Sequence, residues 1–209
     1  MGSCVTDTIG GFNTYKNELK KDKKSKYLFS LTLFDTSYEN RHVTVSLDAV
    51  PDLTLSTYVP GGMTALYDAI GKSVAAVESS GTKYDKVLTV IMTDGQENSS
   101  REYRLQMVKD LITRKEKEGW TFVFLGADLS AFEVGDRMGV QTSNSVAYNT
   151  TNMGATFSNL ACATMSYSAD PTTKGLVDKD LLKRVPTRSL RAAGMSRRTG
   201  PFANAQRTR

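Results

Sequence analysis

Only two cysteines and one histidine occur among the 209 residues, and this scarcity excludes several classes of protein. Cys4 and Cys162 lie far apart and do not suggest a disulfide framework, and no Cys-x-x-Cys pair or histidine cluster of the zinc-binding kind is present. His42 has no serine, cysteine or second histidine beside it in a nucleophile elbow, so it is a poor general base. Sparse cysteines fit a reducing compartment, and we expect a cytoplasmic protein.

Long apolar runs are also lacking. No run approaches the roughly 20 apolar residues that cross a bilayer, and residues 1–7 contain neither the basic nor the apolar segment of a secretory signal. There is no Gly-x-x-x-x-Gly-Lys loop for nucleotide phosphates. We therefore expect no membrane partner, and these absences argue against a P-loop nucleotide hydrolase.

Positive charge is concentrated at the C-terminal end. The formal net charge is +5, but residues 181–209 hold eight lysines and arginines and no acidic residue. Residues 1–180 therefore keep 19 of the 27 basic residues and all 22 acidic ones, a net charge of −3. We predict one domain over residues 1–166 and a basic, disordered tail over residues 167–209. We expect no nucleic-acid partner except through the arginines of this tail. These lack interleaved aromatic residues and a binding fold, so a solvated tail is the simpler expectation.

Within the domain, helical and strand patterns alternate. Apolar spacing predicts a first helix near 6–21, and a possible capping box of Ser99 and Glu102 marks the start of a later one. The alternation predicts an α/β fold, namely a Rossmann-like three-layer sandwich with a mostly parallel central sheet and one antiparallel edge strand. The strands are expected at 27–34, 43–47, 87–92, 120–125 and 145–148, and the other helices at about 64–80, 130–138 and 153–165.

Three segments place small oxygen ligands where the loops at one sheet edge are expected. They are Gly2-Ser3 before the first helix, the segment 61–70 that opens the second helix, and the strand end 90–95. Ligands bind at the carboxyl ends of strands in open α/β sheets. Hydroxyl and carboxylate oxygens are what Mg²⁺ or Mn²⁺ accepts, with water in the remaining positions. The sequence therefore predicts a divalent-cation site at this edge.

The same segments resemble the von Willebrand factor type A (vWA) family over roughly residues 2–166. The resemblance rests on a helix, a hairpin, the sequence Gly-Gly-x-Thr-Ala-Leu-Tyr-Asp-Ala-Ile, and a strand ending Thr-Asp-Gly-x-Glu-Asn. In that family an Asp-x-Ser-x-Ser loop, a distant threonine and a distant aspartate form a metal ion-dependent adhesion site (MIDAS), and a carboxylate of the protein partner completes it. The resemblance implies metal ligation by Ser3, Thr64 and Asp94. It also implies a protein-binding module of bacterial or phage type, and no enzyme.

The chain departs from this pattern at its start. Met1 stands where the first serine of the loop is expected, and the leading aspartate and the first central strand would lie upstream. Either the domain is N-terminally truncated, the alternative we favour, or another segment fills the central position and the metal site is degraded. In both cases we expect Mg²⁺ or Mn²⁺ binding to be weak or absent, because Mg²⁺ gives up its waters reluctantly.

Simpler roles and rival functions stay open. Thr64 alone could be a helix cap and Asp94 a turn residue. Glu97 and Asn98 are expected to be solvated loop residues, and Asp35, Asp68 and Asp128 to be loop or helix-face carboxylates. One rival function is a Mg²⁺-dependent phosphoryl-transfer enzyme that uses Asp94. The other is a metal-free scaffold that binds partners through its basic tail.

Overall fold

The computed structural model describes residues 4–127, 131–148 and 153–170. It has five helices and five strands within these ranges, together with short 3₁₀ turns at 47–49 and 142–144. In chain order the main elements are α1 (Val5–Lys21), β1 (Leu28–Phe34), β2 (Tyr38–Ser46), α2 (Leu66–Ser79), β3 (Val87–Thr93), α3 (Leu105–Lys117), β4 (Trp120–Gly126), α4 (Ala131–Arg137), β5 (Ser145–Ala147) and α5 (Met153–Ala169).

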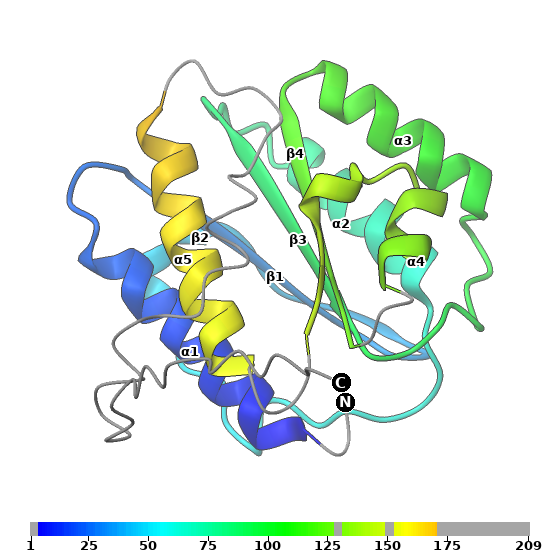
Figure 1. Cartoon of the computed structure of the whole chain (residues 1–209), viewed down its shortest axis with the longest axis horizontal. Coiled ribbons are helices and arrows are strands. Elements are labelled where there is room, and N and C mark those ends of the chain that lie inside the picture. Colours follow the sequence, from blue (N-terminus) through cyan, green and yellow to red (C-terminus); the bar gives the residue numbers. More distant parts are fainter. Residues whose placement is uncertain (1–3, 128–130, 149–152, 171–209) are drawn as a thin grey trace, which may run out of the picture.

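The strands form two separate sheets. β1 and β2 pair as an antiparallel hairpin, which confirms the predicted hairpin, and β3, β4 and β5 form a parallel sheet in that order. The fold is therefore mixed α/β, as predicted. The single, mostly parallel sheet that the sequence predicts does not form among the described residues, because β1 pairs only with β2 and β3 only with β4. Figure 1 shows the hairpin and the parallel sheet as distinct ribbons.

Helices pack on both faces of the parallel sheet (Figure 1). All seven residues of β4 are buried, and alternate side chains point to opposite faces. Val123 and Leu125 pack with α1 and α5. Phe122 and Phe124 pack with α2 and α3. A strand covered on both faces is typical of parallel sheets, and this is why residues 120–125 are recognisable as a nearly continuous apolar run.

α1 packs against α5 and against the loop that follows β2. Gly11 lies so close to the Phe157 ring that a Cβ on Gly11 would stand 2.1 Å from Phe157 Cδ2. The Tyr15 hydroxyl is 3.1 Å from Thr164 Oγ1. The buried Lys16 ammonium donates to the Val50 carbonyl at 3.1 Å and pairs with Asp52. These contacts fix the start of α1, and hence the chain just after Ser3, relative to the sheets.

The predicted capping box is wrong. α3 begins at Leu105, Arg104 is its N-cap without a side-chain cap, and Ser99 Oγ is buried without a hydrogen-bond partner. Glu97 and Asp68 accept hydrogen bonds from the backbone N–H groups of residues 99–103 instead. These side chains hold the segment as a loop, so the helix starts later.

α5 continues past the predicted domain boundary. It runs to Ala169, and Tyr167 is 4% exposed and accepts a hydrogen bond from Thr121 Oγ1 at 3.1 Å. Residues 167–169 therefore belong to the packed part of the protein. The predicted tail from residue 171 onward lies outside the described residues.

Among the described helices, none combines the length and the apolar character that crossing a membrane requires.

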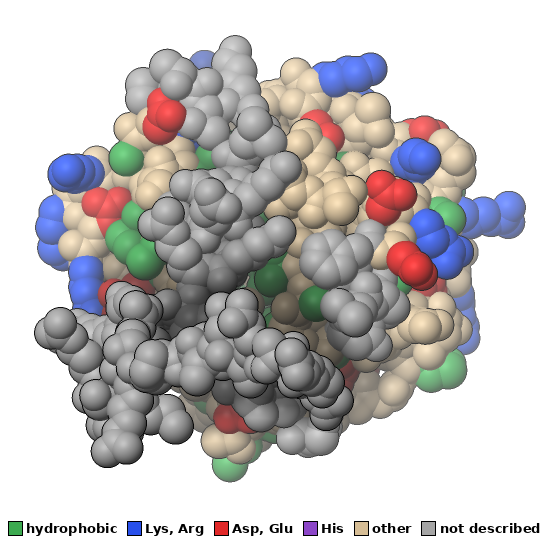
Figure 2. Space-filling model, in the orientation of Figure 1, with side chains coloured by type: hydrophobic (Ala, Val, Ile, Leu, Met, Phe, Trp, Pro, Cys, Tyr) green, Lys and Arg blue, Asp and Glu red, His purple; other side chains and the backbone are tan. Residues whose placement is uncertain are grey.

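Figure 2 shows acidic and basic side chains interspersed over the α3 and α4 side of the face in view. Nucleic-acid backbones are bound by clustered lysines and arginines, and this part of the face does not have that arrangement.

Candidate metal-binding loop face

Three loops meet where the carboxyl ends of β1 and β3 approach the start of α2, and we call residues 35–37, 61–65 and 94–100 the loop face. The Ala65 N–H donates to the Asp35 carbonyl at 2.8 Å, and the Met63 N–H donates to Thr36 Oγ1 at 2.8 Å. Between Thr64 and Asn98 the bonds are reciprocal: the Thr64 N–H donates to Asn98 Oδ1 at 2.7 Å, and the Asn98 N–H to the Thr64 carbonyl at 3.0 Å. The three loops are thus tied to one another.

The loop face contains two of the three predicted ligands, Thr64 and Asp94. A Cβ on Gly95 would stand 2.5 Å from Thr64 Oγ1, so the threonine hydroxyl lies directly against the residue that follows Asp94. Thr64 is half-buried and Asp94 is exposed. A hydroxyl and an exposed carboxylate on neighbouring loops are the kinds of oxygen donor that a hard cation accepts.

The third predicted ligand, Ser3, lies outside the described residues, as does Asp128. Cys4, the next residue after Ser3, is 5% exposed and lies close enough to Tyr148 to interact with it electrostatically. The Tyr148 N–H donates to the carbonyl of Gly126, at the carboxyl end of β4. The beginning of α1 therefore lies at the same edge of the parallel sheet as Asp94.

Glu97 is not the solvated residue that the sequence predicts. Its Oε1 accepts the N–H groups of Ser99 and Ser100 at 2.9 and 2.8 Å. Its Oε2 accepts the N–H of Tyr67, in the first turn of α2, at 3.0 Å. A carboxylate is stabilising at a helix N-terminus, where N–H groups lack helical partners. Glu97 and the exposed Asn98 therefore hold the segments of the loop face and the start of α2 together, a role that sequence spacing could not indicate.

Asp68 performs a similar structural role, as the prediction of a helix-face carboxylate allows. The side chain is 7% exposed and accepts the N–H groups of Arg101, Glu102 and Tyr103 at 2.9, 3.0 and 2.8 Å. Burial raises its pKa, but the three N–H donors and the nearby Lys72 ammonium outweigh burial and leave the pKa below its usual value. Asp68 is thus a charged anchor between α2 and the segment before α3.

Asp35 is a further carboxylate at the loop face. Its Oδ1 accepts the N–H and hydroxyl of Ser37 at 2.6 and 2.8 Å, and these hydrogen bonds lower its pKa. Its Oδ2 faces Gly61, at 4.0 Å from the position of a Cβ there. The sequence does not link Asp35 to the motif, since only the fold brings the end of β1 to the start of α2.

Comparison with protein-family models gives no match, and comparison with curated proteins gives none either. Within the described part of the chain, no group of three or more histidine, cysteine, aspartate or glutamate side chains is placed to hold a metal. A site formed by hydroxyls and one aspartate is of a different kind, because its donors are mainly neutral oxygens. Thr64 and Asp94 offer the oxygen donors that Mg²⁺ or Mn²⁺ accepts, and the Thr64 hydroxyl lies against Gly95, the residue after Asp94.

Proposed function

We propose that the protein is a protein-binding module of the vWA type, with a Rossmann-like sandwich architecture, and that its loop face uses Mg²⁺ or Mn²⁺ to hold a partner. One observation carries the proposal: the Thr64 hydroxyl lies against Gly95, the residue that follows the exposed Asp94. Thr64 and Asp94 would bind the cation, with Ser3 as a third ligand. The partner then supplies an acidic side chain at the remaining coordination position, where the cation strengthens the contact with that carboxylate.

The use of polar side chains to position backbone at the loop face favours binding over catalysis. Asn98 and Glu97 use their side chains to hold the backbone of residues 64–67. Asp68 uses its carboxylate in the same way on residues 101–103. These polar groups are therefore engaged in positioning the loops. A rigid face with an exposed carboxylate suits docking of a partner, since preorganised loops lose little conformational freedom on binding.

The proposal requires binding that is weak, as the incomplete motif predicts, but not absent, and it is tested by thermal unfolding with and without millimolar Mn²⁺ or Mg²⁺. A cation that binds only the native state at about ten times its Kd stabilises by about 1.4 kcal/mol, which is about 3–6 °C for a domain of this size. Asp94→Asn and Thr64→Ala should each remove the shift. Asp110→Asn, which changes an exposed carboxylate on α3, should retain it. A shift that survives Asp94→Asn would contradict the proposal.

A second prediction disturbs the geometry without removing a ligand. Gly95→Ala places a methyl group 2.5 Å from the present position of Thr64 Oγ1, so the threonine side chain must rotate away. We expect the free energy of unfolding without metal to change by less than about 1 kcal/mol, because the short Thr64 side chain can rotate to make room. The metal-dependent shift should fall at least as far as in Thr64→Ala. An unchanged metal response in Gly95→Ala would show that the position of the Thr64 hydroxyl is irrelevant to cation binding.

A further inference from the structure

Positive charge within residues 1–170 is concentrated in one short stretch. Residues 20–26, which we call the lysine turn, hold five lysines and one aspartate, and the remainder of residues 1–170 holds 12 basic and 19 acidic residues, a net charge of −7. Residues 171–209 hold ten basic and two acidic residues. We propose that the lysine turn, together with the basic segment 171–209, binds the phosphate backbone of a nucleic-acid duplex at the end of the molecule away from the loop face.

The lysine turn has a defined shape that exposes its charges. α1 ends within it, and the Asp22 carboxylate accepts the Lys24 N–H at 2.8 Å and the Tyr27 hydroxyl at 2.7 Å. Asp22, the one acidic residue of the stretch, therefore holds the turn together. Four of the five lysines are exposed, and only Lys21 among these pairs with a described acidic side chain, that of Glu18.

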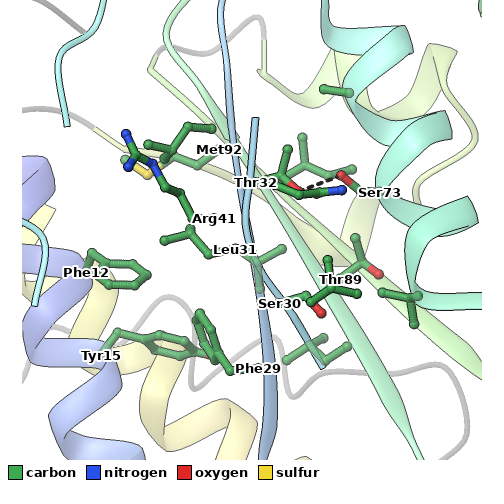
Figure 3. Close-up of a pocket in the computed structure, with 18 of the residues that line it drawn as sticks. Phe12, Tyr15, Phe29, Ser30, Leu31, Thr32, Arg41, Ser73, Thr89 and Met92 are labelled. Atoms are coloured by element: carbon green, nitrogen blue, oxygen red, sulfur yellow. Dashed lines mark hydrogen bonds between the residues drawn. The ribbon is translucent and has the colours of Figure 1, made fainter. Parts of the chain in front are cut away.

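The packing of α1 leaves the lysine turn at the surface. Phe12 and Tyr15 of α1 point toward Phe29 of β1 (Figure 3), so one face of the helix is held against the hairpin. Figure 2 shows basic side chains along the left side of the view, over the end of α1. The helix dipole favours cations at a helix carboxyl end, and the ammonium groups of Lys20 and Lys23 do contact backbone carbonyls there. That role does not account for the other three lysines.

The lysine turn lies beside the point where the basic segment 171–209 begins. Tyr27, the residue after the turn, interacts with Ser168 near the end of α5. The Lys86 ammonium donates to the Tyr167 carbonyl at 2.6 Å, which ties the start of β3 to the same place. The turn and the segment that follows α5 therefore contribute their charges at one end of the protein. The sequence alone does not show that these two basic stretches are neighbours.

The lysine turn and the loop face lie at opposite ends of β1. This strand runs from Leu28 to Phe34, and seven residues in a strand span about 20 Å. Figure 1 shows the turn after α1 (blue) and the end of α5 (orange) on the side away from the carboxyl ends of β1 and β3. Since acidic residues predominate outside the turn, a polyanion is attracted to one end of the domain and repelled by the rest. The bound protein would present its loop face away from the nucleic acid.

The distribution of charge favours a duplex over other anionic partners. The ten basic residues of the segment 171–209 are spread along its whole length, and seven of them are arginines, whose planar guanidinium binds phosphate through two hydrogen bonds. A duplex offers one negative charge per about 1.7 Å of its axis, whereas an acidic patch on a protein is compact. The lysine turn contains neither an aromatic residue for stacking on single-stranded bases nor an apolar residue for insertion into a bilayer.

The test measures binding of the full chain to a fluorescent DNA duplex of about two helical turns, without divalent cations, as the salt concentration is raised from about 50 to 200 mM. We expect the Kd to rise about 10³-fold over this range, because each neutralised phosphate releases counterions. Two duplexes of unrelated sequence, and an RNA duplex of the same length, should bind within about threefold of one another, because contacts to phosphate carry no sequence information. A single strand should bind more weakly.

Replacing Lys21, Lys23 and Lys24 by glutamine tests the lysine turn itself. We expect the Kd at about 100 mM salt to rise at least tenfold, and the slope of log Kd against log salt concentration to fall by about 2–3. The matched control removes the same charge from α3, by glutamine at the exposed Lys109, Arg114 and Lys117. The control should change the slope by less than about 1, because α3 is not part of the proposed surface.

Three outcomes would overturn the proposal. The first is duplex binding that does not depend on salt, or no binding at the lowest salt concentration. The second is an equal effect of the two triple substitutions, which would show that net charge and not the lysine turn determines binding. The third is tighter binding to polyglutamate, or to vesicles containing phosphatidylserine, than to the duplex at an equal concentration of negative charge. Because no divalent cation is present, these outcomes do not depend on the proposed metal site.

Discussion

Replacing Asp68 by alanine is expected to destabilise the protein by about 3 kcal/mol, the largest loss that we predict for a single polar side chain. The substitution removes a charged acceptor from three backbone N–H groups in residues 101–103 and leaves those donors partly buried. Hydrogen bonds to charged groups contribute about 1.5–3 kcal/mol each, and unsatisfied buried donors add a desolvation cost. Urea unfolding of the variant measures the loss.

Asp68→Asn is the matched control. It keeps the side-chain volume and one acceptor oxygen, but turns an NH₂ group toward at least one of the three donors, so we expect about half the loss. A loss below about 0.5 kcal/mol in Asp68→Ala would contradict the anchoring role, since surface substitutions commonly fall in that range.

The lowered pKa of Asp68 also predicts how the stability of the protein changes at acid pH. Its folded pKa lies below its usual value, so its stabilising contribution is complete above the unfolded pKa of about 4. The contribution is lost as the pH falls from there through the lower folded pKa. Between about pH 5 and pH 3 the stability difference between the native chain and Asp68→Asn should therefore shrink. A difference that stays constant over this range would show that the charge of Asp68 is unimportant.

Alanine substitutions at two adjacent glycines of α1 should change the stability of the protein in opposite directions. A Cβ at Gly11 would meet the Phe157 ring at 2.1 Å, whereas a Cβ at Gly10 has nothing within 4 Å. Alanine is favoured over glycine within a helix by about 1 kcal/mol, so Gly10→Ala should stabilise by about that amount. At Gly11 the clash with a buried ring outweighs this gain, because overpacking costs about 1–3 kcal/mol. We expect a net loss of about 1–2 kcal/mol.

A second substitution separates the clash from any other cause. Phe157→Leu leaves room beside α1, so adding Gly11→Ala to this background should cost less than in the native chain, and the double-mutant cycle should show favourable coupling. Strictly additive effects would indicate that the contact between Gly11 and Phe157 is not the cause of the stability loss in Gly11→Ala. Thermal or urea unfolding of the four chains is the measurement.

Much of the local structure follows from the sequence because its causes are local. The apolar run at 120–125 predicts β4 within one residue, since a strand covered on both faces needs apolar side chains at every position. The alternation at 43–47 indicates β2, although this strand begins earlier, at Tyr38, where the hairpin pairs exposed polar residues. The helical periodicity of residues 6–21 likewise predicts α1 closely.

Other features depend on contacts between distant residues. The start of α3 is displaced because Asp68, more than 30 residues earlier, binds the N–H groups that a helix would have used. The Ser99 and Glu102 pattern is a local signal for a helix start, but the hydrogen bonds from residues 101–103 to Asp68 determine where α3 begins. The separation of β1 from β3 could not be read from their composition, because both have the apolar character of paired interior strands.

The site was predictable in part. The motifs place Thr64 and Asp94 at loop positions, and in the fold the Thr64 hydroxyl does lie against the residue after Asp94. The roles of Glu97 and Asn98 could not be predicted, because each acts on the backbone of a loop some 30 residues away. Metal ligation by Ser3, Thr64 and Asp94 stays a prediction, as does the binding of an acidic partner.

The most direct measurement of the central claim is anomalous X-ray diffraction from crystals of the protein soaked in millimolar Mn²⁺. A cation held by the loop face should give a peak between Thr64 Oγ1 and the Asp94 carboxylate, at coordination distances of about 2 Å from its direct oxygen ligands. The peak should be absent from Asp94→Asn crystals that diffract equally well. A peak elsewhere on the protein, or none at the loop face under these conditions, would contradict the account.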